Sequence, residues 1–370
     1  MKYIPINLPY LGEEEKKEVL KVLDSGYLTN KLGQGPMVSE FEKSFAKYIG
    51  CKYAIATNSG TSALHALLLS LDLDQKSEVI VPSFTFVATA SVVLHVGAKP
   101  VFVDIDPEIF TIDPSKLEKL INKNTKAIIL VHLFGHPADL DPILDIAEKY
   151  DIYVLEDACQ AHGAEYKNKK VGCLADAGCF SFYPSKNMTT GEGGMITTNN
   201  DEINEKVRMI INHGEKTVYN TVRLGHNFRM PEISASIGKV QLQKLPEFIS
   251  KRTKNAEYLN TNLKDMDDIQ IPVVKPWAKH CWYMYTITLL NHDEKSRDLF
   301  VNKLNEASIG AGVYYKKPVH MMPLFKKFYN SSLNLEITEK IIKQVLSIPV
   351  HPKLTNEELK YIIEKINEFI

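Results

Sequence analysis

The chain has 370 residues, which is more than one ordinary domain needs and predicts two domains. Hydrophobic residues make up 44% of the chain and charged residues 24%, the balance of a globular protein with a core of normal size. A net charge of −1 provides no basic excess for nucleic acid or for an anionic membrane, so neither is expected as a partner.

The first residues and the cysteines favour a cytoplasmic protein. The stretch MKYIPINLPYLGEEEKKEV lacks the apolar segment of a signal peptide, and no apolar run approaches the roughly 18 residues of a membrane span. The number of cysteines is odd and no pair has CxxC spacing, which disfavours both a disulfide framework and a zinc site. Reduced thiols are expected at Cys51, Cys159, Cys173, Cys179 and Cys281.

Short apolar runs alternate with helical patterns over the first 200 residues. The expected strands are Tyr53–Thr57, Glu78–Val81, Val101–Asp104, Lys126–His132, Ile152–Glu156, Gly178–Phe182 and Gly194–Thr198. Helices are expected at Thr61–Leu71, Phe86–Val96 and Asp141–Tyr150. Nearly continuous apolar strands separated by helices predict an α/β fold with a mostly parallel, seven-stranded sheet covered on both faces. Only a glycine-rich turn joins the last two strands, so one of them is expected to run antiparallel.

The pattern changes after about residue 240 and predicts a smaller C-terminal α+β domain. We place the large domain at residues 1–245 and the small one at 246–370, and these bounds allow the N-terminal segment to pack on the small domain. The expected elements are a helix at Lys239–Asn262, a strand at Met284–Leu290, and helices at Ser296–Ala307, Ile337–Leu346 and Thr355–Phe369.

Ligands of an open parallel sheet bind beyond the carboxyl ends of its strands, so the residues that follow each strand are candidates for a site. The segment 58–61, Asn-Ser-Gly-Thr, follows the first strand and opens a helix. Hydroxyl groups, a glycine backbone and a helix N-terminus suit a phosphate, although the same residues also make an ordinary helix cap. Phe84 and Phe86 follow the second strand, where core packing and ring stacking on a ligand are equally good explanations.

The fifth and sixth strands add a carboxylate and an amine. Asp157 ends a buried strand, where a carboxylate is costly unless a cation meets it. The stretch CFSFYPSKNMTTGEGGMITT, residues 179–198, supplies Ser181 and places Lys186 in a glycine-rich turn. An amine confined near apolar walls and another cation becomes a nucleophile. A phosphate site, an aromatic plate, a carboxylate and such a lysine together meet the requirements of pyridoxal phosphate.

Single residues in this set also have purely structural explanations. Asp157 could cap the following helix, Arg229 could form an interface ion pair, and Lys186 alone could be a surface lysine. His162 is better explained as a hydrogen-bonded core histidine than as a ligand of any kind. The combination and its order along the chain favour the cofactor site.

The chain resembles the DegT/DnrJ/EryC1/StrS family of sugar aminotransferases, which belong to the aspartate-aminotransferase-like enzymes of fold type I. The resemblance spans nearly the whole chain, and several long motifs occur in the right order. They are GYLTNKLGQGPMVSEFE (26–42), NSGTSALHALL (58–68), VPSFTFVATASVVLHVGAKPVFVDID (81–106), LEDACQAHGAEYKNKKVG (155–172), FSFYPSKN (180–187), GHNFRMPEISASIG (225–238) and VYYKKPVH (313–320).

The resemblance implies roles around pyridoxal 5'-phosphate. Lys186 would form the Schiff base with the cofactor, and Asp157 would pair with its pyridine nitrogen. Gln160 would lie near its phenolic oxygen, and Phe86 would stack on its ring. Gly60, Thr61 and Ser181 would hold its phosphate.

The resemblance also implies a homodimer with shared active sites. Asn227 of one chain would complete the phosphate site of its partner. Tyr314, His320 and Arg229 would contact the nucleotide-sugar substrate. No metal is implied.

The activity implied is the transfer of an amino group from an amino acid, by family analogy glutamate, to a nucleotide-linked 3-keto or 4-keto sugar in amino-sugar and surface-polysaccharide biosynthesis. Relatives with histidine in place of the lysine are dehydratases, so Lys186 favours transamination. A dehydratase, a non-catalytic regulator and an amino-acid transaminase are the alternatives. The last is disfavoured because no late arginine stands in the setting that clamps an α-carboxylate.

Overall fold

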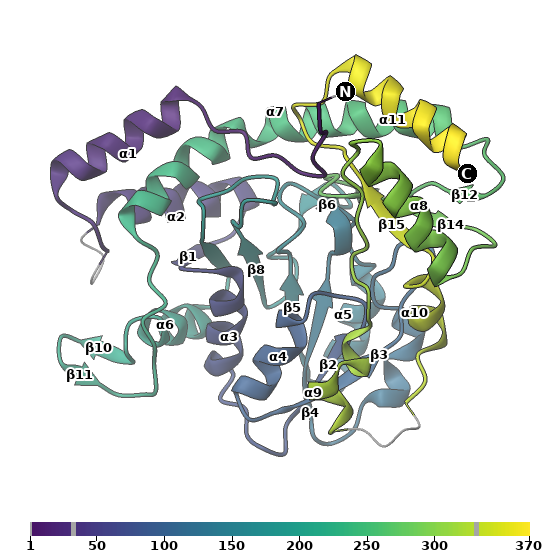
Figure 1. Cartoon of the computed structure of the whole chain (residues 1–370). Helices are drawn as coiled ribbons and strands as arrows, with labels where there is room; N and C mark the ends of the chain where they lie inside the picture. The colour runs from purple at the N-terminus through teal and green to yellow at the C-terminus, as the bar shows by residue number, and fades with distance from the viewer. Residues whose placement is uncertain (1, 31–34, 329–332) are drawn as a thin grey trace.

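A seven-stranded sheet forms the centre of the protein (Figure 1), whose computed structural model describes residues 2–30, 35–328 and 333–370. The strand order is β1-β9-β8-β5-β4-β2-β3, and only β9 runs antiparallel to its neighbours. The predicted mostly parallel sheet is therefore confirmed, including its single reversed strand. The strands are β1 (Tyr53–Thr57), β2 (Glu78–Pro82), β3 (Lys99–Val103), β4 (Thr125–Val131), β5 (Tyr153–Asp157), β8 (Ala177–Ser181) and β9 (Gly194–Thr198).

Helices cover both faces of this sheet because alternate strand residues enter two separate cores. Along β4, Ile128 and Leu130 belong to one core, whereas Ala127 and Ile129 belong to the other. The first core includes α2 (Pro36–Ile49) and α5 (Leu140–Tyr150), and the second includes α3 (Gly60–Ser70), α4 (Ala88–His95) and α6 (Asp201–Ile210). Burial on both faces explains why the strands are almost continuously apolar in sequence.

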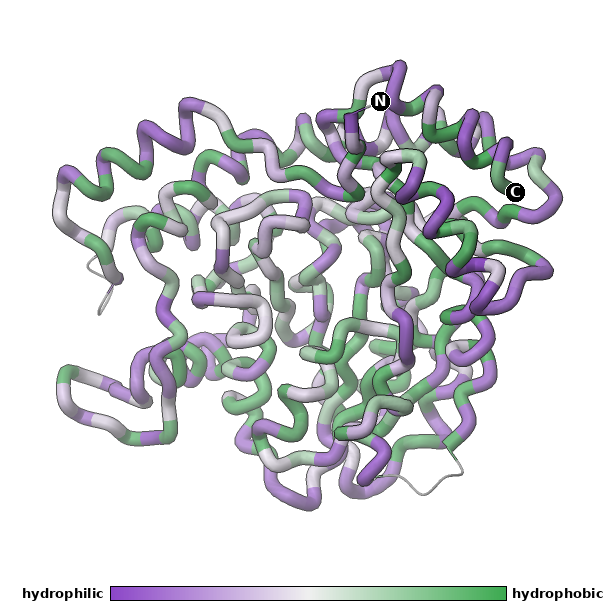
Figure 2. The backbone as a smooth tube through the Cα atoms, in the orientation of Figure 1, coloured by the Kyte–Doolittle hydropathy of each residue, from purple (hydrophilic) through white to green (hydrophobic). Residues whose placement is uncertain are grey.

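The helix α7 (Glu232–Leu263) is 32 residues long and connects the two halves of the molecule (Figure 1). Its first half packs against α2 and α1 (Glu13–Ser25), and α11 (Asn356–Phe369) also packs on it. It begins seven residues before the helix expected from residue 239, and the expected domain boundary after residue 245 falls within it. Along α1, hydrophobic and hydrophilic residues alternate (Figure 2).

The C-terminal region is built around a three-stranded sheet of β12 (Ile269–Gln270), β14 (Tyr285–Leu289) and β15 (Val345–Ile348). The prediction of one helix over residues 337–346 is wrong: α10 (Glu336–Ile341) ends early, and β15 then pairs with β14. Short apolar runs fit a buried strand and a helix equally well, and here the neighbouring strand decides. Ile4 enters the core of this region and bridges to Ile309, so the N-terminal segment does pack on it.

The remaining elements are short or peripheral. They are β6 (Glu165–Tyr166), β7 (Lys169–Lys170), β10 (Glu215–Thr217), β11 (Asn220–Thr221), β13 (Ala278–Lys279), α8 (Glu294–Glu306) and α9 (Pro323–Lys326). Strands β10 and β11 form a hairpin that projects beside α6 (Figure 1). Within the described ranges, no helix combines the length and the apolar character needed to cross a membrane.

Candidate active site

The carboxyl ends of the parallel strands bring the predicted residues to one edge of the sheet. Asn58 follows β1, Ser83 follows β2, Asp157 ends β5 and Ser181 ends β8. Because β9 runs the other way, its first residue, Gly194, lies at this edge as well, opposite the ends of β1 and β8. Motifs that are far apart in the sequence thus lie together in the folded chain.

Asp157 is buried, with only 5% of its surface exposed. One carboxylate oxygen accepts a hydrogen bond from the Thr89 hydroxyl of α4 at 2.8 Å, and the other accepts one from the Cys159 backbone N–H at 3.2 Å. Among the residues that the structure describes, no cationic side chain pairs with it. A buried carboxylate that lacks a cation is costly, so this position fits a partner that brings a positive charge.

Lys186 sits in the turn after β8 and is half-buried. Its Nζ donates to the Tyr283 hydroxyl at 3.3 Å and lies 4.4 Å from the centre of that ring. The same hydroxyl lies 3.0 Å from the Ser185 Oγ. Among the described residues no carboxylate contacts Lys186, so its amine is held against an aromatic ring rather than in an ion pair.

Glycine is required at two places where the backbones around the site approach each other. A Cβ at Gly60 would lie 2.7 Å from the Ser181 Cβ and 3.0 Å from the Cys159 sulfur. A Cβ at Gly194 would lie 2.3 Å from the Ser59 carbonyl oxygen. These contacts close a small cradle at the N-terminus of α3, where free N–H groups and the helix dipole favour a phosphate.

The residues of this cradle keep polar groups available. Ser59 caps α3 by accepting from the Ser62 N–H at 3.0 Å, whereas Thr61 is exposed. The side-chain oxygen of Asn58 is buried and has no hydrogen-bond partner. The free N–H groups of the helix start suit the phosphate of pyridoxal phosphate, and the unpaired carboxylate of Asp157 suits its protonated ring nitrogen.

Gln160 and Phe86 form the opposite wall through Tyr315. The Gln160 Oε1 accepts from the Phe134 N–H at 2.8 Å, and its Nε2 donates to the Tyr315 hydroxyl at 2.9 Å. The Tyr315 ring centre lies 6.0 Å from that of Phe86, which is 52% exposed. Phe84, by contrast, is fully buried. Phe84 is therefore a core residue, whereas the ring of Phe86 is exposed.

For His320, Tyr314 and Asn227 the structure gives the surroundings but does not test the predicted roles. His320 is buried between Ser83, 2.7 Å from its Nδ1, and Glu339, 3.2 Å from its Nε2, and burial lowers its pKa. Tyr314 is half-buried beside Tyr315. The Asn227 side chain is exposed, and its backbone carbonyl accepts from Asn58 at 3.4 Å. The substrate and phosphate roles of these residues stay predictions.

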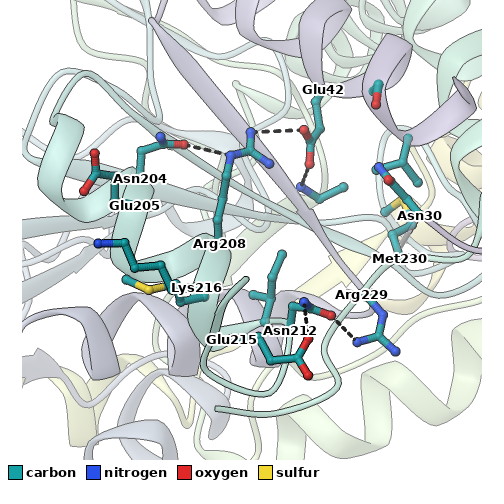
Figure 3. Close-up of a pocket in the computed structure, with 15 residues that line it drawn as sticks. Asn30, Glu42, Asn204, Glu205, Arg208, Asn212, Glu215, Lys216, Arg229 and Met230 are labelled. Atoms are coloured by element: carbon teal, nitrogen blue, oxygen red, sulfur yellow. Dashed lines mark hydrogen bonds and ion pairs between the residues drawn. The ribbon is translucent and has the colours of Figure 1, made fainter. Parts of the chain in front are cut away.

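Arg229 lines a cavity of about 680 Å³ between α2, α6 and the segment that follows α6 (Figure 3). Its Nη1 donates to the Asn212 Oδ1 at 2.6 Å. On the other side of the cavity, Arg208 contacts Glu42 at 3.1 Å. None of the residues that carry the cofactor prediction lines this cavity.

His162 is a core residue, as predicted, but its expected hydrogen bonds are missing. The ring lies between Phe180 and Phe182, and burial lowers its pKa to about 3. It faces the Ser181 backbone, yet neither ring nitrogen forms a hydrogen bond of normal geometry.

Sequence reasoning missed Thr89, Tyr283 and Tyr315. Thr89 lies on the helix after the second strand, within the motif at residues 81–106. Tyr315 is adjacent to the predicted Tyr314. Only an aromatic cluster, HCWYMY at 280–285, marked Tyr283, because its partner Lys186 is 97 positions away.

A lysine, an unpaired buried carboxylate and a glycine-lined cradle at the carboxyl edge of an α/β sheet fit a pyridoxal-phosphate enzyme. Residues 9–367 match the DegT/DnrJ/EryC1/StrS aminotransferase family. The chain belongs to this family, whose members depend on pyridoxal phosphate. The predicted family, fold class and cofactor are confirmed.

Two relatives cover almost the whole chain. The GDP-perosamine synthase of Caulobacter vibrioides is 37% identical over 370 residues, which cover 99% of this chain and 98% of that protein. A protein of Geobacillus stearothermophilus named pleiotropic regulatory protein is 38% identical over 372 residues, with 98% and 99% covered. The match therefore includes both an enzyme and a protein with a regulatory name.

Solved structures show the same fold. DesV of S. venezuelae, solved in complex with a ketimine intermediate, superposes with a TM-score of 0.92 at 32% identity and 99% coverage of both chains. Spr1654 of Streptococcus pneumoniae, in its PLP form, gives a TM-score of 0.94 at 29% identity, with 99% of this chain and 98% of that chain covered.

Proposed function

We propose that the protein is a pyridoxal-phosphate-dependent aminotransferase that moves an amino group from an amino acid, by family analogy glutamate, to a nucleotide-linked 3-keto or 4-keto sugar. Its product would serve amino-sugar and surface-polysaccharide biosynthesis. Two observations carry the proposal: among the described residues, Lys186 contacts no carboxylate, and the buried Asp157 pairs with no cation. The nucleotide-sugar substrate is supported by the GDP-perosamine synthase relative.

Besides Lys186, which would bond to the cofactor, and Asn227 of the second copy, six residues of the chain would hold the cofactor, which supplies an electron sink when bound. Asp157 would hold the proton of the pyridine nitrogen, and Thr89 and the Cys159 N–H keep its carboxylate in place. The other five are Gly60, Thr61 and Ser181 at the phosphate, Gln160 at the phenolic oxygen and Phe86 on the ring.

Lys186 is the group that moves protons. Its Nζ takes the α-proton of the amino-acid donor and returns a proton during turnover, as a general base and then an acid. The Tyr283 hydroxyl orients the amine from 3.3 Å away. Phe86 and Tyr315 form an aromatic wall that limits the access of water.

A homodimer is part of the proposal. Tyr219 is 89% exposed and Leu224 is 77% exposed on the segment that carries the β10–β11 hairpin, and Leu20 and Leu23 of α1 are more than half exposed. Exposed apolar side chains on these two segments are available for contact with a second copy of the chain. In the dimer, the exposed Asn227 would reach the partner's phosphate cradle, and Arg229 would face the partner's substrate. We place the reaction in the cytoplasm, in keeping with five free thiols.

The shared site can be tested by mixing two inactive chains. A Lys186→Ala chain keeps a normal Asn227, whereas an Asn227→Asp chain keeps Lys186 but places a carboxylate beside the phosphate, which repels it strongly. A heterodimer would contain one intact site and recover up to about half of the wild-type activity. No recovery, with subunit exchange confirmed by mass spectrometry, would place Asn227 outside the partner's site.

The substrate class is tested by incubating the purified protein with glutamate and a panel of nucleotide-linked keto sugars. Formation of an amino sugar and 2-oxoglutarate in equal amounts is the expected result. A non-catalytic regulator, which the name of the Geobacillus relative suggests, would produce neither. A dehydratase would consume a sugar without forming 2-oxoglutarate.

A further inference from the structure

Two cysteines that have no part in the cofactor site lie together at the opposite end of the sheet. Cys51 stands between α2 and β1, and Cys173 lies in the loop before β8; both are half-buried and pack on the same core. The two thiols lie within interaction distance of each other. All five cysteines of the chain are free thiols.

The strand register explains why residues 122 positions apart meet here. Tyr53, two residues after Cys51, pairs with Thr198 of β9. The Thr198 hydroxyl donates to the Asp176 carbonyl at 2.7 Å, and the Thr197 hydroxyl donates to the Gly172 carbonyl. The start of β1 and the loop 172–176 are therefore tied to the same residues of β9.

Both thiols are held in position by further contacts. The Cys51 sulfur lies 3.2 Å from the Tyr53 carbonyl oxygen. The neighbours of Cys173 are fixed because the backbone N–H groups of Gly172 and Leu174 each donate to Glu156 at 2.6 Å. A preformed thiol pair of this kind needs little rearrangement to react.

Cys51 is also accessible to a small reagent. It lines an open surface hollow of about 430 Å³, together with Lys43, Lys47 and Lys52. Hydrogen bonding from Cys173 lowers the pKa of the Cys51 thiol, whereas the same contact, followed by burial, raises that of Cys173. Cys51 is thus the better nucleophile and Cys173 the better proton holder.

We propose that Cys51 and Cys173 are a redox modification site that forms a reversible disulfide when the protein meets hydrogen peroxide. The Cys51 thiolate attacks one peroxide oxygen, the O–O bond breaks, and hydroxide leaves, which oxidises Cys51 to a sulfenic acid. The Cys173 sulfur then attacks the Cys51 sulfur, the S–O bond breaks, and water leaves with the Cys173 proton. The two electrons come from the thiols, and peroxide is reduced.

The cysteines beside the cofactor site provide an internal comparison. Burial raises the pKa of Cys159 well above its usual range, and that of Cys179 as well. Cys281 is fully buried and its pKa rises to about 12 for the same reason. These three thiols should react much more slowly than Cys51.

The test is a peptide map of the cofactor-loaded protein after treatment with hydrogen peroxide, digested without reductant. A cross-linked peptide pair containing Cys51 and Cys173, which dithiothreitol separates, is expected. A cross-link that involves Cys159, or oxidation of other cysteines while Cys51 and Cys173 remain reduced, would overturn the proposal.

Two serine variants separate the roles of the thiols. In Cys173→Ser, Cys51 should stop at the sulfenic acid and become labelled by dimedone. In Cys51→Ser, peroxide should modify Cys173 at least about tenfold more slowly than it modifies Cys51 in the wild type. Equal rates, or no dimedone label on Cys51 in Cys173→Ser, would refute the assignment. Circular dichroism of each variant confirms its fold, and the readout is independent of aminotransferase activity.

Discussion

Glu156 and Asp157 are adjacent buried carboxylates at the end of β5, but alternation along the strand sends them to opposite faces of the sheet, into different surroundings. Glu156 accepts from three backbone N–H groups, of Gly172, Leu174 and Ala175, and lies 3.0 Å from the His132 Nε2. Asp157 receives two neutral hydrogen bonds and no ion pair. The protein itself fills the hydrogen-bonding capacity of Glu156, so this carboxylate stabilises the fold. Asp157 retains capacity to bind a positively charged ligand.

The largest expected effect on activity comes from removing the amine of Lys186. Lys186→Ala should reduce transamination by at least about ten-thousandfold, because no other group is placed both to bond and to move the proton. The purified wild-type protein should be yellow, and this colour should change in Lys186→Ala. Lys169→Ala, at an exposed lysine of β7, is the matched control and should retain normal rates. Normal turnover in Lys186→Ala would remove the central assignment.

Asp157→Asn tests the charge of the unsaturated carboxylate. An amide keeps the shape and the bond from Thr89 but cannot stabilise a charged pyridinium, so kcat should fall by at least about a thousandfold. Cofactor binding and the unfolding midpoint should change little. A rate within about tenfold of the wild type would mean that another residue holds the nitrogen.

The corresponding carboxylate-to-amide replacement at Glu156 should lower the stability of the fold. Glu156→Gln puts an NH₂ group against backbone donors and removes the charge, so the free energy of unfolding should fall by about 3 kcal/mol. Denaturant unfolding measures this, and the rate per folded molecule should stay near that of the wild type. If the two variants exchanged their phenotypes, the assignment of the two faces would be reversed.

The smallest effect concerns buried histidines without hydrogen-bond partners. Burial lowers the pKa of His351 to about 4 and that of His162 to about 3, below the value of about 6.5 in an unfolded chain. Between about pH 4 and pH 6.5 the unfolded chain binds more protons than the folded one, so stability should rise with pH in that window.

Urea midpoints measured from pH 4 to pH 7 would show this rise. His351→Leu, which has a similar volume and cannot titrate, should reduce the slope. A slope identical to that of the wild type would show that His351 does not stay neutral on folding.

Much of the candidate site could be read from the sequence because strand ends carry it. In a parallel sheet, residues after successive strands must meet at one edge, so Gly60, Asp157, Ser181 and Lys186 could be grouped before any contact was known. Tyr283 could not be found this way, because it comes from the segment before β14 and reaches Lys186 only through packing of the two halves.

Local pattern predicted the seven-stranded sheet and the reversal of one of its last two strands, and it grouped candidate residues for a cofactor site, because hydrophobic periodicity and a short glycine turn are properties of adjacent residues. The tertiary structure alone decided that residues 345–348 form a strand, since only pairing with β14 distinguishes a buried strand from a helix there. It alone decided that Phe84 enters the core while Phe86 stays free, and that Glu156 is saturated while Asp157 is not. Each of these outcomes depends on which distant groups arrive at a position, and neighbours in sequence do not specify that.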